Sequence, residues 1–173
     1  MKKRKAKLLA GEKFRAICHH EAGHAVACYM YKISIRFVTV EPEDKYLGLV
    51  KTHVVRVRER LEDWRIRRPR LLAERFVRVC LAGEIAQKRY SKKSFSPYHS
   101  KYDWDIAVNV AAKICGNLEE ALAWCHFLYL NTRNELTGDR NWKAVKALAN
   151  RLKTEKRLGA REARRIIETT IYS

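Results

Sequence analysis

The sequence contains no uninterrupted apolar run that approaches the roughly 18 residues of a membrane-spanning helix. Its N-terminal segment starts with basic residues but has only a three-residue apolar patch before Gly11 and Glu12, which is too short for the apolar core of a secretory signal peptide. We therefore expect a protein without a transmembrane segment and with a cytoplasmic location.

The sequence also lacks any C-x-x-C pair. Its cysteines are odd in number, widely spaced, and mostly placed within apolar helical runs: Cys18, Cys28, Cys80, Cys115 and Cys125. Such residues are typical of small buried side chains in a reducing compartment. The sequence therefore predicts neither a disulfide framework nor a thiolate metal site.

Acidic residues are scarce. The chain has 37 Lys and Arg against 19 Asp and Glu, a net charge of +18 that exceeds what solubility requires and that attracts polyanions. The excess lies in residues 1–15, 56–78, 88–101 and 140–173, whereas residues 16–55 are balanced. This distribution predicts a basic face that is separate from any catalytic face.

The remaining composition is that of a globular protein. A length of 173 residues and a hydrophobic content of 47% are ordinary for one domain with a core, and no internal repeat is visible. We expect a single domain over residues 1–173, in which residues 1–10 form a flexible basic tail.

Apolar periodicity predicts an α+β protein that is mainly helical, with one small sheet. Two neighbouring strands are expected within residues 34–44 and 46–57. A helical region is expected over 56–90, where Pro69 fits only at a kink or at the first turn of a new helix. The other predicted helices cover residues 13–31, 102–115, 118–131, 141–153 and 160–170, and a polar loop is expected over 91–101.

The segment CHHEAGHAVACYM, residues 18–30, contains the candidate metal ligands and the candidate general base. His20 and His24 are one helical turn apart, so both imidazoles can bind the same metal ion. Zinc held by two histidines and a carboxylate keeps an open position, at which it lowers the pKa of water to about 7. Glu21 is then the candidate general base.

The other histidines fit less demanding roles, and an H-E-x-x-H pattern also arises by chance. His19 is offset by about 100° from His20 on a helix, so we expect it in a supporting wall. His53 is expected on an exposed strand and His99 in a solvated loop. His126 lies in an apolar helical run and is predicted to be a packed core residue.

The residues around the motif resemble one family, the M41 peptidases, which are the proteolytic domain of FtsH-type AAA proteases. HEAGHAV is similar to the H-E-A-G-H-A signature, and FVTVEP and YLGLV stand where the family has two strands. CLAGEIAQKRY resembles the L-x-G-G-R-A-A-E-E block, and KYDWDIAVNVA looks like the N-D-L-x-x-A-T helix. The resemblance spans nearly all of the chain, and it implies a helical, zincin-like peptidase domain with one small β-sheet.

This resemblance implies that Asp103 is the third ligand of one Zn²⁺ ion. A ligand 83 positions after His20 must come from another helix packed across the first, and we expect Asp103 to open the helix after the polar loop. Asp105 is the rival carboxylate, but it points about 200° away from Asp103. A plain N-cap role for Asp103 is the alternative.

The resemblance also implies a substrate-binding strand. An exposed edge strand can pair with an extended substrate, and residues 47–54 are the candidate, with Gly48, Leu49 and Val50 as substrate-binding residues. The sequence departs from the family at Gln87 and Lys88, which replace a pair of glutamates, and at Tyr102, which replaces an asparagine. These changes spare the zinc ligands but alter the residues expected to support them.

The sequence as a whole predicts a zinc-dependent metalloendopeptidase that hydrolyses unfolded or flexible polypeptides. It has no G-x-x-x-x-G-K-[ST] motif, so we expect ATP-independent activity, with a separate ATPase partner or a homo-oligomer as open alternatives. Two imidazoles and a carboxylate also suit iron or cobalt. The competing hypothesis is a basic nucleic-acid-binding or scaffold protein with a degenerate peptidase site, although no known nucleic-acid-reading motif is present.

Overall fold

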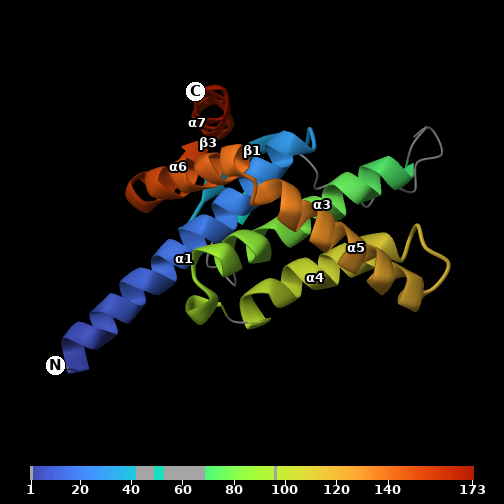
Figure 1. Ribbon diagram of the computed structural model, residues 1–173, viewed down its shortest axis with the longest axis horizontal. Helices are drawn as coiled ribbons and strands as arrows, with labels where there is room; N and C mark the ends of the chain where they lie inside the picture. The colour runs from blue at the N-terminus through green and yellow to red at the C-terminus, as the bar shows by residue number, and fades with distance from the viewer. Residues whose placement is uncertain (1, 42–48, 53–68, 96) are drawn as a thin grey trace.

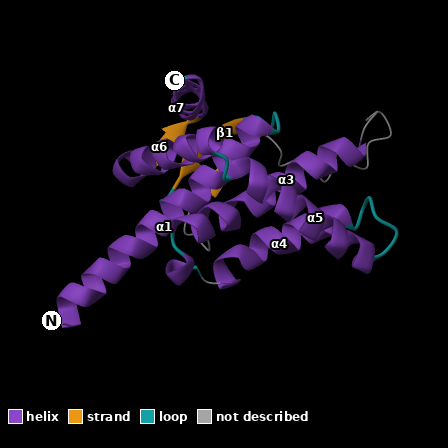
Figure 2. Ribbon diagram, in the orientation of Figure 1, coloured by secondary structure: helices purple, strands orange, loops and turns teal. Residues whose placement is uncertain are grey.

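The computed structural model describes residues 2–41, 49–52, 69–95 and 97–173. Figures 1 and 2 show a mainly helical protein whose helices pack around one another, with one small antiparallel sheet at one side. This confirms the α+β, mainly helical class that the sequence predicts. Within the described residues, no helix is both long and apolar enough to cross a membrane.

Helix α1 (Lys2–Met30) is the long helix that carries the histidine motif. It starts eleven residues before the predicted start at Lys13, so the segment expected as a flexible tail forms its first turns and extends beyond the other elements (Figure 1). That segment is rich in Lys, Ala and Leu, which favour helix, and this explains the difference. Flexibility of these turns stays a prediction.

Helix α1 ends in a Schellman motif. Lys32 adopts a left-handed conformation with φ of 59°, and the Ile33 amide donates to the Cys28 carbonyl at 2.8 Å. This arrangement satisfies the last carbonyls of the helix and turns the chain into the first strand.

The sheet has three strands in the order β2-β1-β3, all antiparallel: β1 (Ile35–Thr39), β2 (Leu49–Thr52) and β3 (Arg157–Gly159). Strands β1 and β2 lie within the two predicted segments, and β2 is an edge strand of the described sheet. Strand β3 was not predicted from the sequence, because three residues between two helices are too few to show an alternating pattern.

Helices α3 (Pro69–Tyr90) and α4 (Pro97–Ala111) both begin with proline, which fits the first turn because that position needs no N–H donor. The alternative in which Pro69 starts a new helix is therefore confirmed, and the rest of the predicted 56–90 helix, residues 56–68, lies outside the described residues. A short 3₁₀ helix (Lys92–Ser94) follows α3 in the chain.

The early start of α4 corrects two expectations. The polar loop predicted over 91–101 is shorter, and Asp103 does not open the helix. Asp103 lies in the second turn, so the N-cap alternative is wrong, because Pro97 initiates the helix before it. Helix α4, which contains Asp103, packs mainly on α3 and α5. The expectation that it packs across the histidine-bearing helix α1 is therefore not met.

The C-terminal half consists of α5 (Leu118–Leu136), α6 (Asp139–Glu155) and α7 (Ala160–Tyr172), close to the predicted helices. Asn117 caps α5 by accepting from the Glu120 amide at 2.8 Å. Helix α6 packs along α1, and α7 packs on α6 and β1.

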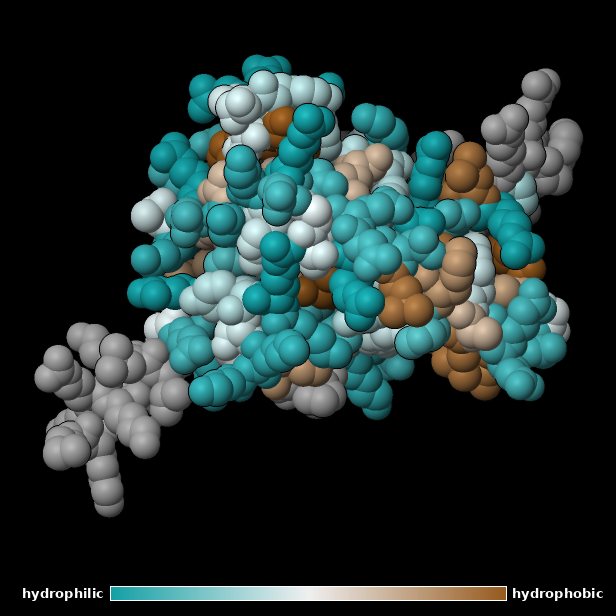
Figure 3. Space-filling view, in the orientation of Figure 1, coloured by the Kyte–Doolittle hydropathy of each residue, from teal (hydrophilic) through white to brown (hydrophobic). Residues whose placement is uncertain are grey.

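The predicted burial of His126 in α5 is wrong. His126 is exposed, together with its neighbour Phe127 and with Leu118 and Leu122 on the same helix. Figure 3 shows brown apolar side chains at the end of the molecule where α5 begins. An apolar helical run predicts burial of the helix, but it does not say which of its faces lies against the core.

Helices α1 and α3 are packed with almost no side chain between them at Gly23. A Cβ at position 23 would lie 2.6 Å from both the Ala82 carbonyl oxygen and the Ala86 Cβ. The small side chains around this crossing let the two backbones approach closely. The five cysteines are free. Four of them are buried in the hydrophobic core, as predicted, and Cys115 is half-buried.

Candidate metal centre

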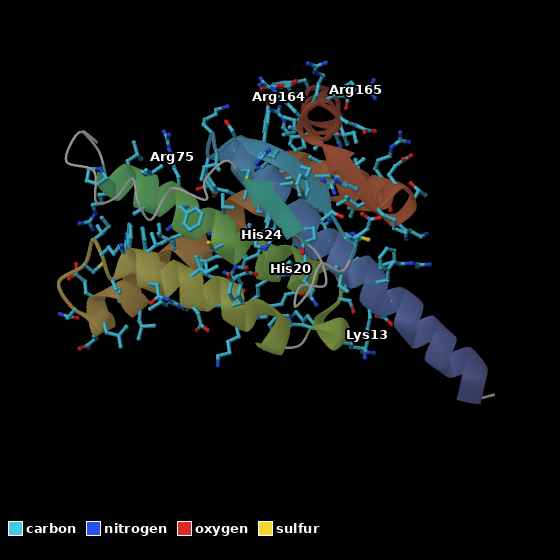
Figure 4. All side chains as sticks on the ribbon, turned by 180° about the vertical axis from the view of Figure 1, so that it is seen from behind. Lys13, His20, His24, Arg75, Arg164 and Arg165 are labelled. Atoms are coloured by element: carbon cyan, nitrogen blue, oxygen red, sulfur yellow. The ribbon has the colours of Figure 1, made fainter. Side chains whose placement is uncertain are left out.

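Two imidazoles of α1 face α3 in the interior of the protein. The side chains of His20 and His24 are 11% and 10% exposed, and Figure 4 shows both residues where α1 crosses the green ribbon of α3. Their spacing of four residues places them on one face of the helix, as the sequence predicts. Their Nε2 atoms lie 3.0 Å apart.

The carboxylate of Asp103 completes the group. Its Oδ2 lies 3.1 Å from Nε2 of His20 and 3.4 Å from Nε2 of His24. The Asp103 side chain is 21% exposed, so the group borders on solvent at the Asp103 side. The three residues offer ligand atoms close enough to hold one metal ion, which is the combination predicted from the sequence.

Hydrogen bonds on the other side of each ring fix the imidazole tautomers. Nδ1 of His24 donates to the Val79 carbonyl at 2.7 Å, and Nδ1 of His20 lies 3.2 Å from Oε1 of Gln87. A carbonyl oxygen only accepts, so Nδ1 carries the proton and Nε2 of a neutral ring presents its lone pair. Two ring nitrogens and a carboxylate oxygen then converge as acceptors, an arrangement that needs a cation or a proton between them.

The separations of these atoms fit a tetrahedral metal ion. Zinc bonded at roughly 2.0–2.1 Å holds neighbouring ligand atoms about 3.3–3.4 Å apart, which is the edge of the tetrahedron. The three separations here, 3.0, 3.1 and 3.4 Å, are close to that value. Two imidazoles and one carboxylate also leave a fourth position for water, as in catalytic zinc sites.

Gly83 of α3 provides the space in front of the two rings. A Cβ at position 83 would collide with Nε2 of His24 and would lie 2.6 Å from Nε2 of His20. Gly83 is a residue of the site that was not predicted from the sequence. A lone glycine inside an otherwise helical run was the available signal, because glycine lowers helix stability unless packing or function requires it.

Glu21 is buried beside the group, and its carboxylate interacts electrostatically with His20, His24 and Asp103. Burial raises the pKa of Glu21, and the two histidines offset this only in part. A carboxylate whose pKa is raised toward neutrality is suited to accept and return a proton.

The metal-free group holds a proton. Burial opposes a charge on His24, but the adjacent Asp103 carboxylate outweighs it and raises the pKa of His24 to about 9. Burial likewise opposes ionisation of Asp103, yet the two imidazoles hold the pKa of Asp103 well below its usual range. The protonated ring and the carboxylate thus form an ion pair that a metal ion would replace.

Two of the three residues that differ from the M41 pattern, Gln87 and Lys88, contact the group or its neighbours. Gln87 is buried and holds His20, as described above. Lys88 pairs with Glu84 at 2.6 Å, and the other Glu84 oxygen accepts from Nε1 of Trp104 at 2.7 Å. Trp104 follows Asp103 in the chain, so this network ties α3 to the turn of α4 that contains Asp103.

The structure separates the other candidates from the group. Asp105 is exposed on α4, which agrees with its predicted orientation. His19 does not form a wall of the metal group, because its ring stacks on Tyr90 and its Nδ1 donates to the Arg15 carbonyl at 2.8 Å. Gly48 and His53 lie outside the described residues, as does the side chain of His99.

The remaining substrate-binding candidates, Leu49 and Val50, form the first half of β2. They pair with Thr39 and Val38 of β1. The predicted edge position of this segment is confirmed for the described sheet.

Comparison of the sequence with models of known protein families gives no match, and no characterised protein matches it significantly.

Two glycine substitutions should separate the site from the fold. Gly83→Ala should push the imidazoles apart and lower zinc affinity by about 10- to 100-fold, and the cost of displacing two buried, hydrogen-bonded rings should cancel the gain of about 1 kcal/mol in helix propensity. Gly23→Ala should destabilise the fold by about 1–3 kcal/mol, because the added carbon meets backbone. Chelator competition and thermal unfolding measure the two effects, and a Gly83→Ala protein that binds zinc like wild type would contradict the assignment.

The His24–Asp103 ion pair should make the stability of chelator-treated protein depend on pH. Because folding raises the pKa of His24 to about 9, its contribution is complete below pH 6.5 and is lost as the pH rises through about 9. Denaturant unfolding of wild type and His24→Gln should therefore differ most at about pH 5–6, where Asp103 is still ionised, with a pH-dependent part of up to about 3 kcal/mol. Parallel pH profiles for the two proteins would rule out this coupling.

Proposed function

We propose that this protein is a zinc-dependent metallopeptidase of the M41 type, with a zincin-like site. The observation that carries the proposal is the convergence of His20 Nε2, His24 Nε2 and Asp103 Oδ2 at 3.0–3.4 Å, with Glu21 buried beside them. The resemblance of HEAGHAV and KYDWDIAVNVA to the family pattern supports the same assignment.

His20, His24 and Asp103 would hold the ion. When bound, zinc in such a site polarises the carbonyl group of a substrate and lowers the pKa of water. The chain's own residues prepare this chemistry. Val79 and Gln87 orient the two rings, and Gly83 keeps the space in front of them free of side-chain atoms.

Glu21 would move the protons of the reaction. Its raised pKa makes the carboxylate a better base than an exposed glutamate. It would accept the proton of the attacking water and deliver it to the amine of the departing peptide. Because Glu21 adjoins both histidines in a buried turn, little free water competes for that proton.

Strand β2 would bind the substrate. It is an edge strand of the described sheet, and it contacts α1, the helix that carries His24. An extended polypeptide can hydrogen-bond to such an edge, with Leu49 and Val50 as pairing positions. Only an unfolded or flexible segment offers this extended backbone, so we propose flexible polypeptides as substrates.

Glu21→Gln tests the proton transfer. The variant keeps the size of the side chain and all three ligands, so it should bind one zinc ion while peptide hydrolysis falls by about 10²–10⁴-fold. His24→Ala should lose both zinc and hydrolysis. Zinc content of purified protein and cleavage of unfolded casein are the measurements.

Asp103→Asn and Asp105→Asn form the matched control pair on one helix. Asp103→Asn should weaken zinc binding and activity, whereas Asp105→Asn should leave both near wild type because Asp105 is exposed outside the group. The proposal would be contradicted if wild-type protein could not be loaded with zinc, or if Glu21→Gln hydrolysed peptides as fast as wild type. Tight nucleic-acid binding by zinc-free protein would then favour the binding-module hypothesis.

Backbone-modified substrates test the role of β2. Amide N-methylation removes one donor at a time from a cleavable peptide, so every second position should be sensitive, with about 5- to 10-fold losses in kcat/KM for one lost hydrogen bond. Positions in between should tolerate the methyl group better. Equal sensitivity at all positions would exclude strand pairing without affecting the metal assignment.

A further inference from the structure

A cavity lies on the side of α1 away from the metal centre. It has a volume of about 400 Å³ and is enclosed by α1, the end of α3 and the length of α6. Arg15, Cys18 and His19 are its α1 residues, and they face away from His20 and His24 because a helix turns by about 100° per residue. The cavity is therefore separate from the metal centre.

The lining of this cavity is cationic. Arg15, Arg89, Lys146 and Lys153 contribute to it, and no acidic residue does. All four are exposed at the rim, and within the described part of the chain none of them forms an ion pair with a carboxylate. The ion pairs of these helices join other cations to glutamates: Arg78 and Lys88 of α3, Arg151 of α6 and Arg164 of α7. The four cations of the cavity lie on one concave surface without a carboxylate, so they attract an anion.

Aromatic rings form the inner part of the cavity. His19 is buried and stacks on Tyr90 with ring centroids 3.9 Å apart and planes at 16°. Trp142 of α6 lies across from this stack, 6.0 Å from His19, and the Arg89 guanidinium lies over it at 4.5 Å. These rings offer flat apolar surface next to the cations.

His19 adds a polar group to this wall. Its Nδ1 donates to the Arg15 carbonyl, so Nε2 of the neutral ring is an acceptor. Asn150 at the rim provides a second neutral polar side chain.

We propose that this cavity binds a nucleotide, with its phosphates on the Arg15, Lys146 and Lys153 side and its base against Tyr90 and Trp142. The volume lies within the range of small-ligand sites, and phosphate-binding cations beside stacking rings are the two recognition elements that a nucleotide requires. A simple anion would use the cations alone. This site is independent of the proposed peptidase activity.

Titration calorimetry with the full-length chain tests the proposal, with ATP, inorganic tripolyphosphate and adenosine as probes. ATP should bind at least about tenfold more tightly than either of the others, because it alone engages both cations and rings. Trp142→Leu should lower the affinity for ATP to that for tripolyphosphate. If tripolyphosphate bound as tightly as ATP, the nucleotide assignment would be wrong. If neither compound bound, the cavity would not be an anion-binding site.

Charge reversals on α6 provide the matched control. Lys146→Glu with Lys153→Glu should weaken ATP binding by about tenfold or more, whereas Arg140→Glu with Lys143→Glu makes the same change in net charge outside the cavity and should have a much smaller effect. Asp103→Asn should not change ATP affinity, because it lies at the other site. Equal losses in both charge-reversed proteins, or loss of ATP binding in Asp103→Asn, would contradict the proposed location.

Discussion

The close crossing of α1 and α3 is the constraint on which the other features depend. Gly23 lets the backbones approach, and Gly83 then leaves room in front of the rings of His20 and His24. A larger residue at either position would separate the helices or displace the rings. Helix α4 packs on α3 beside Glu84 and brings Asp103 to the same point.

The convergence of acceptors has an electrostatic cost that the protein offsets in two ways. Ring nitrogens and a carboxylate that face one another in a buried place repel unless a proton or a cation lies between them. In metal-free protein the proton on His24 has this role, which explains why its pKa rises despite burial. The same geometry therefore favours binding of a metal cation, and proton and metal compete for one position.

Helix α1 separates two chemically different regions. One face presents the imidazoles of His20 and His24 toward α3, and another face contributes Arg15 and His19 to a cationic cavity beside α6. Adjacent residues of one motif, His19 and His20, thus belong to different sites because a single helical step turns the side chain by about 100°.

The sequence by itself determined the helical class, the pairing of His20 with His24, and the choice of Asp103 over Asp105. These follow from local periodicity, from spacing on one helix and from a family resemblance, none of which needs knowledge of distant contacts. It failed where a result depends on which face of a helix is covered, as at His126, or where an element is too short to show a period, as in β3.

Only the tertiary structure decided how the rings are oriented and what lies in front of them. The partner of His24 is a carbonyl 55 residues away and that of His20 an amide 67 residues away, and the free space before both rings comes from Gly83. The nucleotide-sized cavity likewise combines residues from three helices. Such features arise when side chains from separate elements pack together, and a linear pattern carries no record of that packing.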